Sequence, residues 1–441
     1  MTLRVNLHEL GAMDGAARAA LMLRADQELG DVLERAAPII EAVRTEGEAA
    51  LRRFARDLDG VTGELGALEA TEEDFEVAYR AVEPEVIAAI RYAVANIRRF
   101  HEKQLPEPMW LEEVRPGAFA GDRWTPIPSV ALYVPRGKGA FPSVTMMTSV
   151  PAMVAGVPEA CILTPPTPQG GVDAATLVAA REAGVGRVFK AGGAQAVAAA
   201  AFGAGPIPKA AKIVGPGSPW VVAAKRLLAG RIDTGLPAGP SESIVFADET
   251  ADPRLAAADL MIEAEHGPDS SAYLVTHDRA VAEGALAALP GLIAALPEQR
   301  AGFVSTVLGG PRGGVVLAAS LEDAYAFVND YAPEHLEVLS DEPFAHLGRI
   351  VNAAEVLLGR RTPITLGNFV LGPNCVLPTG GWAKSFGPLS VTDFMKRSSV
   401  GYVTAAAYPE MARHAHALAR YEGFAAHAAA VAMDRDRAPV R

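Results

Sequence analysis

The 441-residue sequence predicts an α/β protein with two parallel sheets, because it is long and contains two stretches in which strand-like and helix-like segments alternate. A single hydrophobic core rarely grows beyond about 250–300 residues, so a chain of this length favours two or more domains. The first alternating stretch begins near residue 129 and the second near residue 242. Strands that alternate with helices usually pair in parallel through right-handed crossovers. Each stretch therefore predicts one sheet.

The first predicted sheet comes from short β-rich runs, each of which ends in proline or glycine. Such punctuation is typical of strands in α/β units. Helix-like stretches separate the runs and supply the crossovers. The runs are 129–135, 159–166, 187–192 and 211–217, and the helix-like stretches are 143–155, 173–183, 194–202 and 219–229.

The second predicted sheet comes from a similar series of runs. Asp252 and Pro253 supply an N-cap and a first-turn proline for a helix that reaches His266. The strand-like runs are 242–248, 270–276, 313–319 and 336–340.

The two ends of the chain are predicted to be mainly helical. Before residue 130, apolar residues three or four apart share one face of a helix over 85–100, and Thr71 with Asp74 indicates the cap of the helix before it. Past Leu389 the alternation stops, and an Ala-rich helix is expected from about residue 410 to about residue 433. Its apolar face needs a partner surface, which a second subunit could supply.

Composition narrows the class of partner. Half of the residues are apolar and 21% are charged, so the chain can bury a sizeable core. A net charge of −12 argues against a nucleic-acid partner, because it leaves no basic face for a phosphate backbone. No export signal and no apolar stretch of roughly 20 residues is present, so we expect a cytoplasmic protein without a membrane span. Cys161, an expected core thiol, and Cys375 fit a reducing compartment. A small-molecule partner is the remaining expectation.

Three strands of the first predicted sheet end in glycine-rich turns. Open parallel sheets bind ligands at the carboxyl ends of their strands, and glycine lets backbone N–H groups approach a pyrophosphate. A tight turn explains any single one of them, whereas three in one domain favour a nucleotide. The turns are 136–139, 192–195 and 215–217.

Two acid–histidine pairs are candidates for chemistry. Glu263 and His266 lie three residues apart, the spacing by which one helix can present two metal ligands, although solvated helices carry such pairs too. Glu334 and His335 are adjacent, between a proline at a helix end and a buried strand, where an acid–base pair would have rigid support. A capping Glu beside a half-buried His is the structural alternative for that pair.

Two further segments carry reactive side chains. The loop 372–381 combines glycine and proline with the thiol of Cys375, and Glu422 and His427 lie on neighbouring faces of the last predicted helix. The remaining histidines lack such neighbours and are assigned to the surface or the core: His8, His101, His277, His346, His414 and His416.

Nine ordered segments carry a resemblance to a known family. They are YVP at 133, GGAQ at 192, GPG at 215, AGPSE at 238, EAEHGPD at 263, APEHLE at 332, VLPTGG at 376, LSVTDF at 389 and EGFAAH at 422. In this order and spacing the sequence resembles the histidinol dehydrogenases from about residue 30 to about residue 432. The resemblance implies a homodimer of two incomplete Rossmann-like domains, with the helical C-terminal tail reaching the partner's active site. The expected division is a metal and substrate domain over 1–132 and 243–389, an NAD-binding domain over 133–242 and a dimerisation tail over 390–441.

The resemblance also implies the chemistry. Family members bind zinc and oxidise an alcohol to an aldehyde and then to a carboxylate, reducing two NAD molecules in succession. His335 would be the general base, and Glu334 would activate the water that attacks the aldehyde. The other roles carried over are NAD contacts for Tyr133, Gln195 and Ser218, and substrate contacts for Ser241, His335, Cys375 and Glu422. The metal ligands, which also line the substrate site, would be Glu263, His266, Asn368 and His427.

Several positions depart from the family pattern. Glu263 stands where the family has Gln and Asn368 where it has Asp, so one carboxylate and one carboxamide remain, with zinc, manganese or another divalent ion as the candidate metal. Cys375 replaces a His, and Arg136 replaces a Gly. Three hypotheses follow: oxidation of histidinol to histidine, oxidation of another small polar alcohol by a family paralogue, as in the sulfopropanediol dehydrogenases, and metal or nucleotide binding without turnover.

Overall fold

The computed structural model describes residues 4–24, 29–136 and 139–435. It divides into two compact units, one within 1–105 and 127–394 and the other within 106–126 and 395–441.

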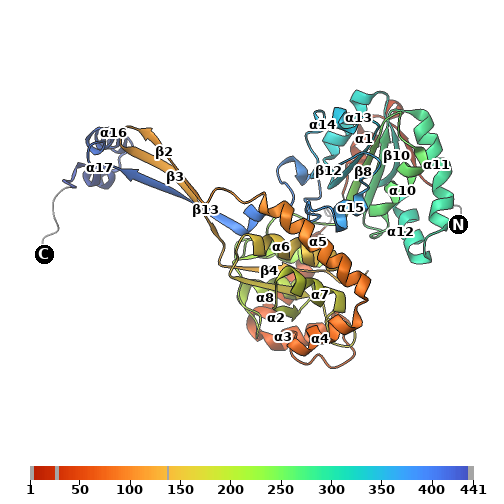
Figure 1. Cartoon of the computed structure of the whole chain (residues 1–441), viewed down its shortest axis with the longest axis horizontal. Helices are drawn as coiled ribbons and strands as arrows, with labels where there is room; N and C mark the ends of the chain where they lie inside the picture. Colours follow the sequence, from red (N-terminus) through yellow and green to blue (C-terminus); the bar gives the residue numbers. More distant parts are fainter. Residues whose placement is uncertain (1–3, 25–28, 137–138, 436–441) are drawn as a thin grey trace. The chain divides into compact units, whose positions relative to one another are not determined.

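The first unit contains a six-stranded parallel sheet with helices on both faces (Figure 1). Its strands are β1 Leu7–Glu9, β8 Glu242–Ala247, β9 Ser271–Thr276, β10 Gly313–Leu317, β11 His335–Leu339 and β12 Glu355–Leu358, and its helices are α1 Gly15–Ala20, α10 Pro253–Ala264, α11 Arg279–Ala294, α12 Glu298–Leu308, α13 Leu321–Tyr331, α14 Pro343–Leu347 and α15 Ile364–Phe369. The strand order is β1-β10-β9-β8-β11-β12. Alternate side chains face opposite ways, so Val245 packs with α10 to α12 and Phe246 packs with α13.

A four-stranded parallel sheet, in the order β6-β5-β4-β7, forms the rest of the first unit. Its strands are β4 Ser129–Tyr133, β5 Glu159–Thr164, β6 Val188–Lys190 and β7 Lys212–Val214, and its helices are α2 Gly30–Glu46, α3 Glu48–Asp57, α4 Glu72–Ala81, α5 Pro84–Glu102, α6 Pro142–Val154, α7 Ala174–Ala183, α8 Gly193–Phe202 and α9 Pro219–Leu228. One face packs against α2, α3, α8 and α9 in a core rich in alanine, and α6 packs on β4 and β5.

The second unit combines an antiparallel sheet with two helices. Its elements are β2 Met109–Arg115, β3 Ala118–Pro126, β13 Met395–Val403, α16 Tyr408–Tyr421 and α17 Ala425–Ala432. β3 is the central strand, and Gly117 has a φ of 78° in the turn that joins it to β2. The Tyr408 hydroxyl donates to the carbonyl of Val431 at 3.0 Å, which ties α16 to the end of α17.

The fold class predicted from the sequence is confirmed: two parallel sheets carry the α/β architecture, and helices form the C-terminus. All eight predicted strand-like runs contain strands. The predicted caps are present too, since Thr71 and Asp74 form a reciprocal capping box at α4 and Asp252 accepts hydrogen bonds at the start of α10.

Three local predictions are wrong. The segment 109–126 forms a hairpin instead of a helix, and the segment 395–403, expected to lack strands, pairs with it. The long terminal helix is two helices, because Gly423 takes a left-handed conformation with a φ of 78° between them.

The packing divides the N-terminal hundred residues between the two sheets. β1 extends the six-stranded sheet, whereas Ile40 and Leu51, from α2 and α3, share a core with Phe189 and Ile213 of the four-stranded sheet. The domain boundaries drawn from the sequence remain a prediction.

The parallel strands place the candidate residues at different edges of the two sheets. In the four-stranded sheet Tyr133 ends β4 and Gly192 follows β6, at the carboxyl edge. In the six-stranded sheet Ser241 precedes β8, and His335 and Glu355 begin β11 and β12, at the amino edge.

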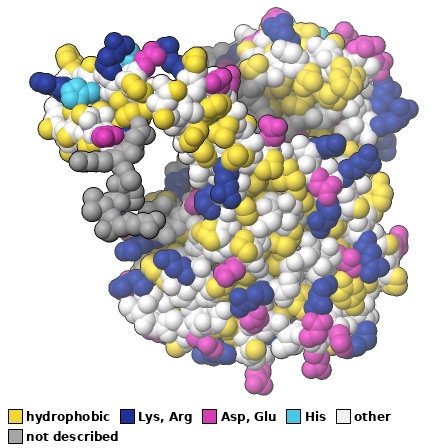
Figure 2. Space-filling view, turned by 60° about the vertical axis from the view of Figure 1, so that its left-hand side comes forward, with side chains coloured by type: hydrophobic (Ala, Val, Ile, Leu, Met, Phe, Trp, Pro, Cys, Tyr) yellow, Lys and Arg dark blue, Asp and Glu magenta, His cyan; other side chains and the backbone are white. Residues whose placement is uncertain are grey.

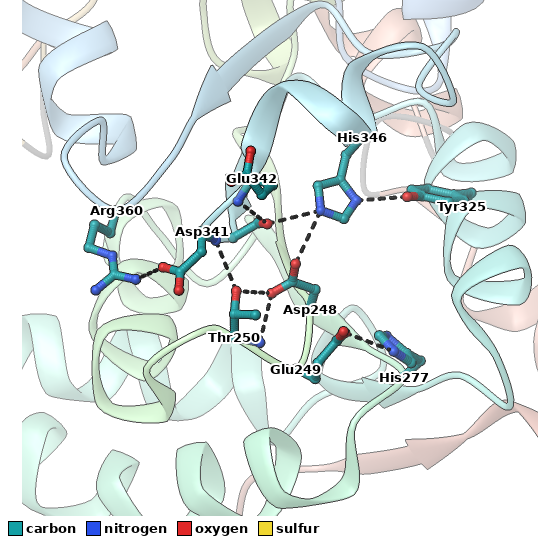
Figure 3. Close-up of polar contacts among 10 residues, drawn as sticks. Asp248, Glu249, Thr250, His277, Tyr325, Asp341, Glu342, His346 and Arg360 are labelled. Atoms are coloured by element: carbon teal, nitrogen blue, oxygen red, sulfur yellow. Dashed lines mark hydrogen bonds and ion pairs between the residues drawn. The ribbon is translucent and has the colours of Figure 1, made fainter.

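A buried polar network lies at the carboxyl edge of the six-stranded sheet (Figure 3). The His346 ring is 2.7 Å from the Tyr325 hydroxyl through Nδ1, and through Nε2 it is 3.2 Å from Asp248 and 3.0 Å from Ser340. The network ties α13 and α14 to the strand ends. His346 is therefore a core histidine, within the surface-or-core assignment made from the sequence.

Charges of both signs are mixed on the face of the molecule that Figure 2 shows. On the face in Figure 2, Lys and Arg side chains alternate with Asp and Glu instead of gathering into one basic patch. Within the described residues no helix is long and apolar enough to cross a membrane.

Candidate functional site

His335 lies at the amino edge of the six-stranded sheet and is buried. It is in register with Glu355 on the neighbouring strand, and its Nδ1 lies 2.7 Å from Oε2 of Glu355. Its Nε2 lies 3.9 Å from Oε1 of Glu334. The Glu355 carboxylate therefore fixes the ring and leaves Nε2 on the side of Glu334.

Glu334 is positioned by the sharp turn that ends α13. Ala332 has a φ of 52°, a conformation that non-glycine residues rarely adopt, and Pro333 follows it. Oε2 of Glu334 accepts the backbone N–H of Glu242 at 2.8 Å. Glu242 in turn lies 3.0 Å from Nε of the buried Arg24. Glu334 is thus held by a backbone N–H at the start of β8, next to the buried Arg24–Glu242 ion pair.

Glu263 lies in the last turn of α10, fully buried. Its Oε1 accepts from Nδ2 of Asn368 at 2.7 Å, and its Oε2 lies 2.8 Å from Nδ1 of His266. The same His266 nitrogen lies 3.0 Å from the Ser241 hydroxyl. The prediction of one helix for both residues is corrected: α10 ends at Ala264, and His266 follows in the next turn of backbone.

These buried groups shift one another's ionisation. Burial acts to raise the pKa of Glu263, but the charges of His266 and His335 outweigh it and lower the pKa to about 2. Burial acts to lower the pKa of His335, but Glu263, Glu355 and Glu334 raise it to about 10. Burial raises the pKa of Glu334 well above its usual value. The side chains of Glu334 and His335 therefore both have a raised proton affinity, which suits groups that accept a proton from a bound molecule.

Cys375 belongs to the same cluster. Burial raises the pKa of its thiol, and the charges of Glu355, Glu334 and Glu263 raise it further, so the thiol stays neutral. The neighbouring Asn374 fixes the loop, since its Nδ2 donates to the carbonyl of Met147 in α6 at 2.6 Å.

A cavity of about 340 Å³ lies at the carboxyl edge of the four-stranded sheet. Tyr133, Gln195 and Ser218, the three predicted NAD contacts, all line it. The Tyr133 hydroxyl accepts the backbone N–H of Gly193 at 3.1 Å, and Gln195 donates to Asp59 at 3.1 Å. The predicted glycine-rich turn 136–139 lies partly outside the described residues, at 137–138.

Glu422 and His427 belong to the second unit, whereas the cluster belongs to the first. Glu422 caps α16, His427 lies on α17, and both side chains are exposed. The structure thus brings the other predicted catalytic, substrate and metal residues together in the first unit: Ser241, Glu263, His266, Glu334, His335, Asn368 and Cys375.

A family model described as histidinol dehydrogenase matches residues 22–435. The chain belongs to the histidinol dehydrogenase family. It is 65% identical over 433 residues to the protein named Histidinol dehydrogenase homolog 2 of Mesorhizobium japonicum, and the match covers 98% of each chain. It is 48% identical over 411 residues to the histidinol dehydrogenase of Synechocystis sp., covering 93% of this chain and 94% of that one.

A solved structure agrees. The crystal structure of histidinol dehydrogenase from Elizabethkingia anophelis superposes with a TM-score of 0.90 at 30% identity, covering 97% of both chains. The resemblance seen in the sequence is confirmed over nearly the whole chain. Histidinol dehydrogenases are oxidoreductases, and this is the enzyme class of the family to which the chain belongs.

The residues around Glu263 suit the divalent metal that this family generally uses. The imidazole of His266 and the carboxamide of Asn368 each lie within hydrogen-bond distance of the Glu263 carboxylate, and oxygen and nitrogen donors of this kind bind zinc or manganese. Over the described part of the chain no three His, Cys, Asp or Glu side chains are arranged to hold a metal. Asn368 supplies a carboxamide to this group, so a metal held here would need a further donor.

Sequence reasoning missed two residues that touch the predicted ones. Glu355 contacts His335, but the strand β12 that carries it was not predicted. Had that strand been recognised, parallel pairing would have placed an acid beside His335. Asp59 contacts Gln195, and no local motif marks it, because it follows a helix that lies far from Gln195 in the sequence.

Proposed function

We propose that this protein oxidises a small polar alcohol to a carboxylate through the aldehyde, in two successive NAD-dependent steps. The contact between His335 and Glu355 supports this most directly. A carboxylate that holds one nitrogen of a buried imidazole leaves the other nitrogen oriented to act as a general base. His335 Nε2 takes the proton of the alcohol in the first step and of the hydrate in the second. Glu334, beside that nitrogen, activates the water that attacks the aldehyde.

The cofactor and metal roles follow from the same arrangement. NAD binds in the cavity lined by Tyr133, Gln195 and Ser218, whose volume is within the range of ligand clefts. Ser241 and Glu422 contact the substrate. Glu263, His266, Asn368 and His427 would hold zinc or another divalent ion, whose charge polarises the alcohol and offsets that of Glu263.

The active unit is a homodimer with exchanged tails, found in the cytoplasm. Glu422 and His427 are exposed on the second unit, so both are available to complete the substrate and metal sets of a partner subunit. The two free cysteines suit a reducing compartment.

Histidinol is the first substrate to test, because the chain is 48% identical to a protein named histidinol dehydrogenase. A second candidate is another small polar alcohol, such as a sulfonated propanediol. Cys375 favours it, because a neutral thiol cannot accept and donate as the family's imidazole does. The relative at 65% identity is named a homolog.

A panel of alcohols supplied with NAD and a divalent metal separates these candidates. NADH formed with histidinol, and not with sulfonated or other polar alcohols, supports the first. The reverse pattern supports the paralogue. No NADH with any alcohol, despite bound metal and NAD, would leave a binding protein without turnover.

A further inference from the structure

Asp59 faces the cavity that we assign to the dinucleotide, and this inference rests on that proposed function. It follows α3 and lines the cavity together with Tyr133, Gln195 and Ser218. Its Oδ2 accepts from Nε2 of Gln195 at 3.1 Å. An acid at this position has no role in the chemistry proposed at His335.

The surroundings of Asp59 are shaped for its carboxylate. The backbone N–H of Gly192 also donates to it. A Cβ added at Gly192 would lie 2.5 Å from Asp59 Oδ1 and 2.8 Å from the Pro165 ring, so a residue with a side chain does not fit there. Burial raises the pKa of Asp59 to about 6, which leaves the group charged at neutral pH.

Two backbone N–H groups at the start of α8 already donate to acceptors within the protein. Asp59 takes the N–H of Gly192 and the Tyr133 hydroxyl takes the N–H of Gly193. A pyrophosphate needs such N–H groups to be available. The cavity instead presents a carboxylate, which attracts hydroxyl donors and repels phosphate.

The cavity suits the half of the dinucleotide that does not react. Ile39, Leu58 and Trp220 give it an apolar wall that a purine ring can cover. The cavity lies at the carboxyl edge of the four-stranded sheet and shares no lining residue with the cluster around His335 at the amino edge of the six-stranded sheet. We therefore place the adenosine in the cavity, with the nicotinamide extending from it.

We propose that Asp59, braced by Gln195, accepts hydrogen bonds from the ribose hydroxyls of the adenosine half and excludes a 2′-phosphate, which selects NAD over NADP. Acidic residues read the ribose of NAD in this way in other dinucleotide folds. Arg136 supplies positive charge in the same cavity, but its Nη1 donates to the carbonyl of Pro166 at 3.2 Å and its charge acts on Asp59. The Arg136 guanidinium is thus partly engaged by the protein itself before a ligand arrives.

Calorimetric titration of the full chain with NAD, NADP, 5′-AMP and 2′,5′-ADP tests this without any turnover. NAD and NADP differ only in the 2′-phosphate, and so do 5′-AMP and 2′,5′-ADP. The ratio of the two affinities within each pair therefore isolates the ribose contact. Wild type should bind NAD and 5′-AMP at least roughly 30-fold more tightly than the 2′-phosphorylated partner. Asp59→Asn should weaken NAD binding roughly 10-fold and bring the two affinities of each pair within about 3-fold of each other.

Three variants make the result specific. Asp59→Glu keeps the charge and should keep rejecting NADP, which also covers the case in which Asp59→Asn fails to fold. Asp57→Asn, an exposed acid two residues away, makes the same charge change outside the cavity and should leave both ratios unchanged. Arg136→Gln should not reverse the preference.

The outcomes separate this inference from the function on which it rests. If the dinucleotides bind and Asp59→Asn does not alter the NAD-to-NADP affinity ratio, the role of Asp59 is overturned. The dehydrogenase proposal then still stands. Equal binding of NAD and NADP by wild type overturns it too. If neither dinucleotide nor 5′-AMP binds, the cofactor site itself is wrong.

Discussion

Glu355 and His335 are paired in register on neighbouring parallel strands, and the carboxylate of the first lies 2.7 Å from Nδ1 of the second. The acid therefore orients the imidazole, and together with the charge of Glu263 it raises the pKa of His335. A carboxylate raises the pKa of a neighbouring histidine because it stabilises the protonated ring. The fold fixes this relationship, because both residues begin strands of one rigid sheet.

Glu355→Gln should lower turnover by roughly 10- to 100-fold, as is typical when the partner of a functional histidine is changed. Glu355 is one of the groups that raise the pKa of His335. Removing its charge should lower that pKa, so the pH at which the rate rises should move downward. A pH–rate profile measures both effects.

The control for Glu355→Gln is Glu322→Gln, an exposed acid that pairs with Arg349. Gly367→Ala supplies an indirect variant, since its Cβ would lie 2.8 Å from Glu355 Oε1 and displace the carboxylate. A profile that stays in place or moves upward in Glu355→Gln would contradict the assigned contact.

Glu334→Gln should impair the second oxidation more than the first. Only the second step needs an activated water, and an amide cannot accept its proton. Aldehyde should accumulate during turnover, and trapping it as a hydrazone measures the amount. Equal losses in the two steps would assign Glu334 to positioning alone.

Glu263 and Asn368 should act as one unit in metal binding. Glu263→Gln removes the one carboxylate of the proposed ligand set and should weaken the metal strongly, whereas the double variant with Asn368→Asp should recover part of the affinity. These residues also bond to each other directly at 2.7 Å. The double-mutant cycle of Glu263→Gln and Asn368→Asp should therefore be measured twice, once by metal titration and once by unfolding of the metal-free protein.

The two measurements separate ligation from the direct hydrogen bond. If the coupling energy measured from metal affinity exceeds the coupling energy measured from metal-free unfolding, the two residues share the metal as ligands. Coupling confined to metal-free stability would mean that Glu263 and Asn368 are structural partners and not ligands.

Exchanged tails can be tested with mixed dimers. One subunit would end before Glu422 and the other would carry His335→Asn. With exchange, one site has both defects and the other has neither, so the purified mixed dimer should keep about half of the wild-type activity. Each homodimer of a defective subunit supplies the control. An inactive mixed dimer would mean that each tail serves its own subunit.

The sequence predicts well what depends on local patterns. Short apolar runs ending in Pro or Gly become strands, and Thr71 with Asp74 forms the expected cap. The hairpin at 109–126 was missed although Pro116–Gly117 signals a turn, because every residue of β2 is exposed and shows no buried face. The strand that pairs with it lies far along the chain.

Only part of the candidate site was predicted, because sequence patterns report relationships between residues that are close in the sequence. Motifs identify Glu263, His266, Glu334 and His335 because they lie close together in sequence. Glu355 joins them only through strand pairing. The rule that ligands bind at carboxyl ends of parallel strands suits the four-stranded sheet, whereas His335 lies at the opposite edge of its sheet. Tertiary packing decides that edge, and periodicity carries no information about it.

The number of NADH molecules formed per alcohol consumed, with His335→Asn as the comparison, tests the central claim most directly. Wild type with its preferred alcohol should form two NADH and one carboxylate. His335→Asn should turn over roughly 100- to 10,000-fold more slowly while it keeps its metal and its affinity for NAD. One NADH per alcohol with the aldehyde as final product, or a variant that retains most of its rate, would contradict the account.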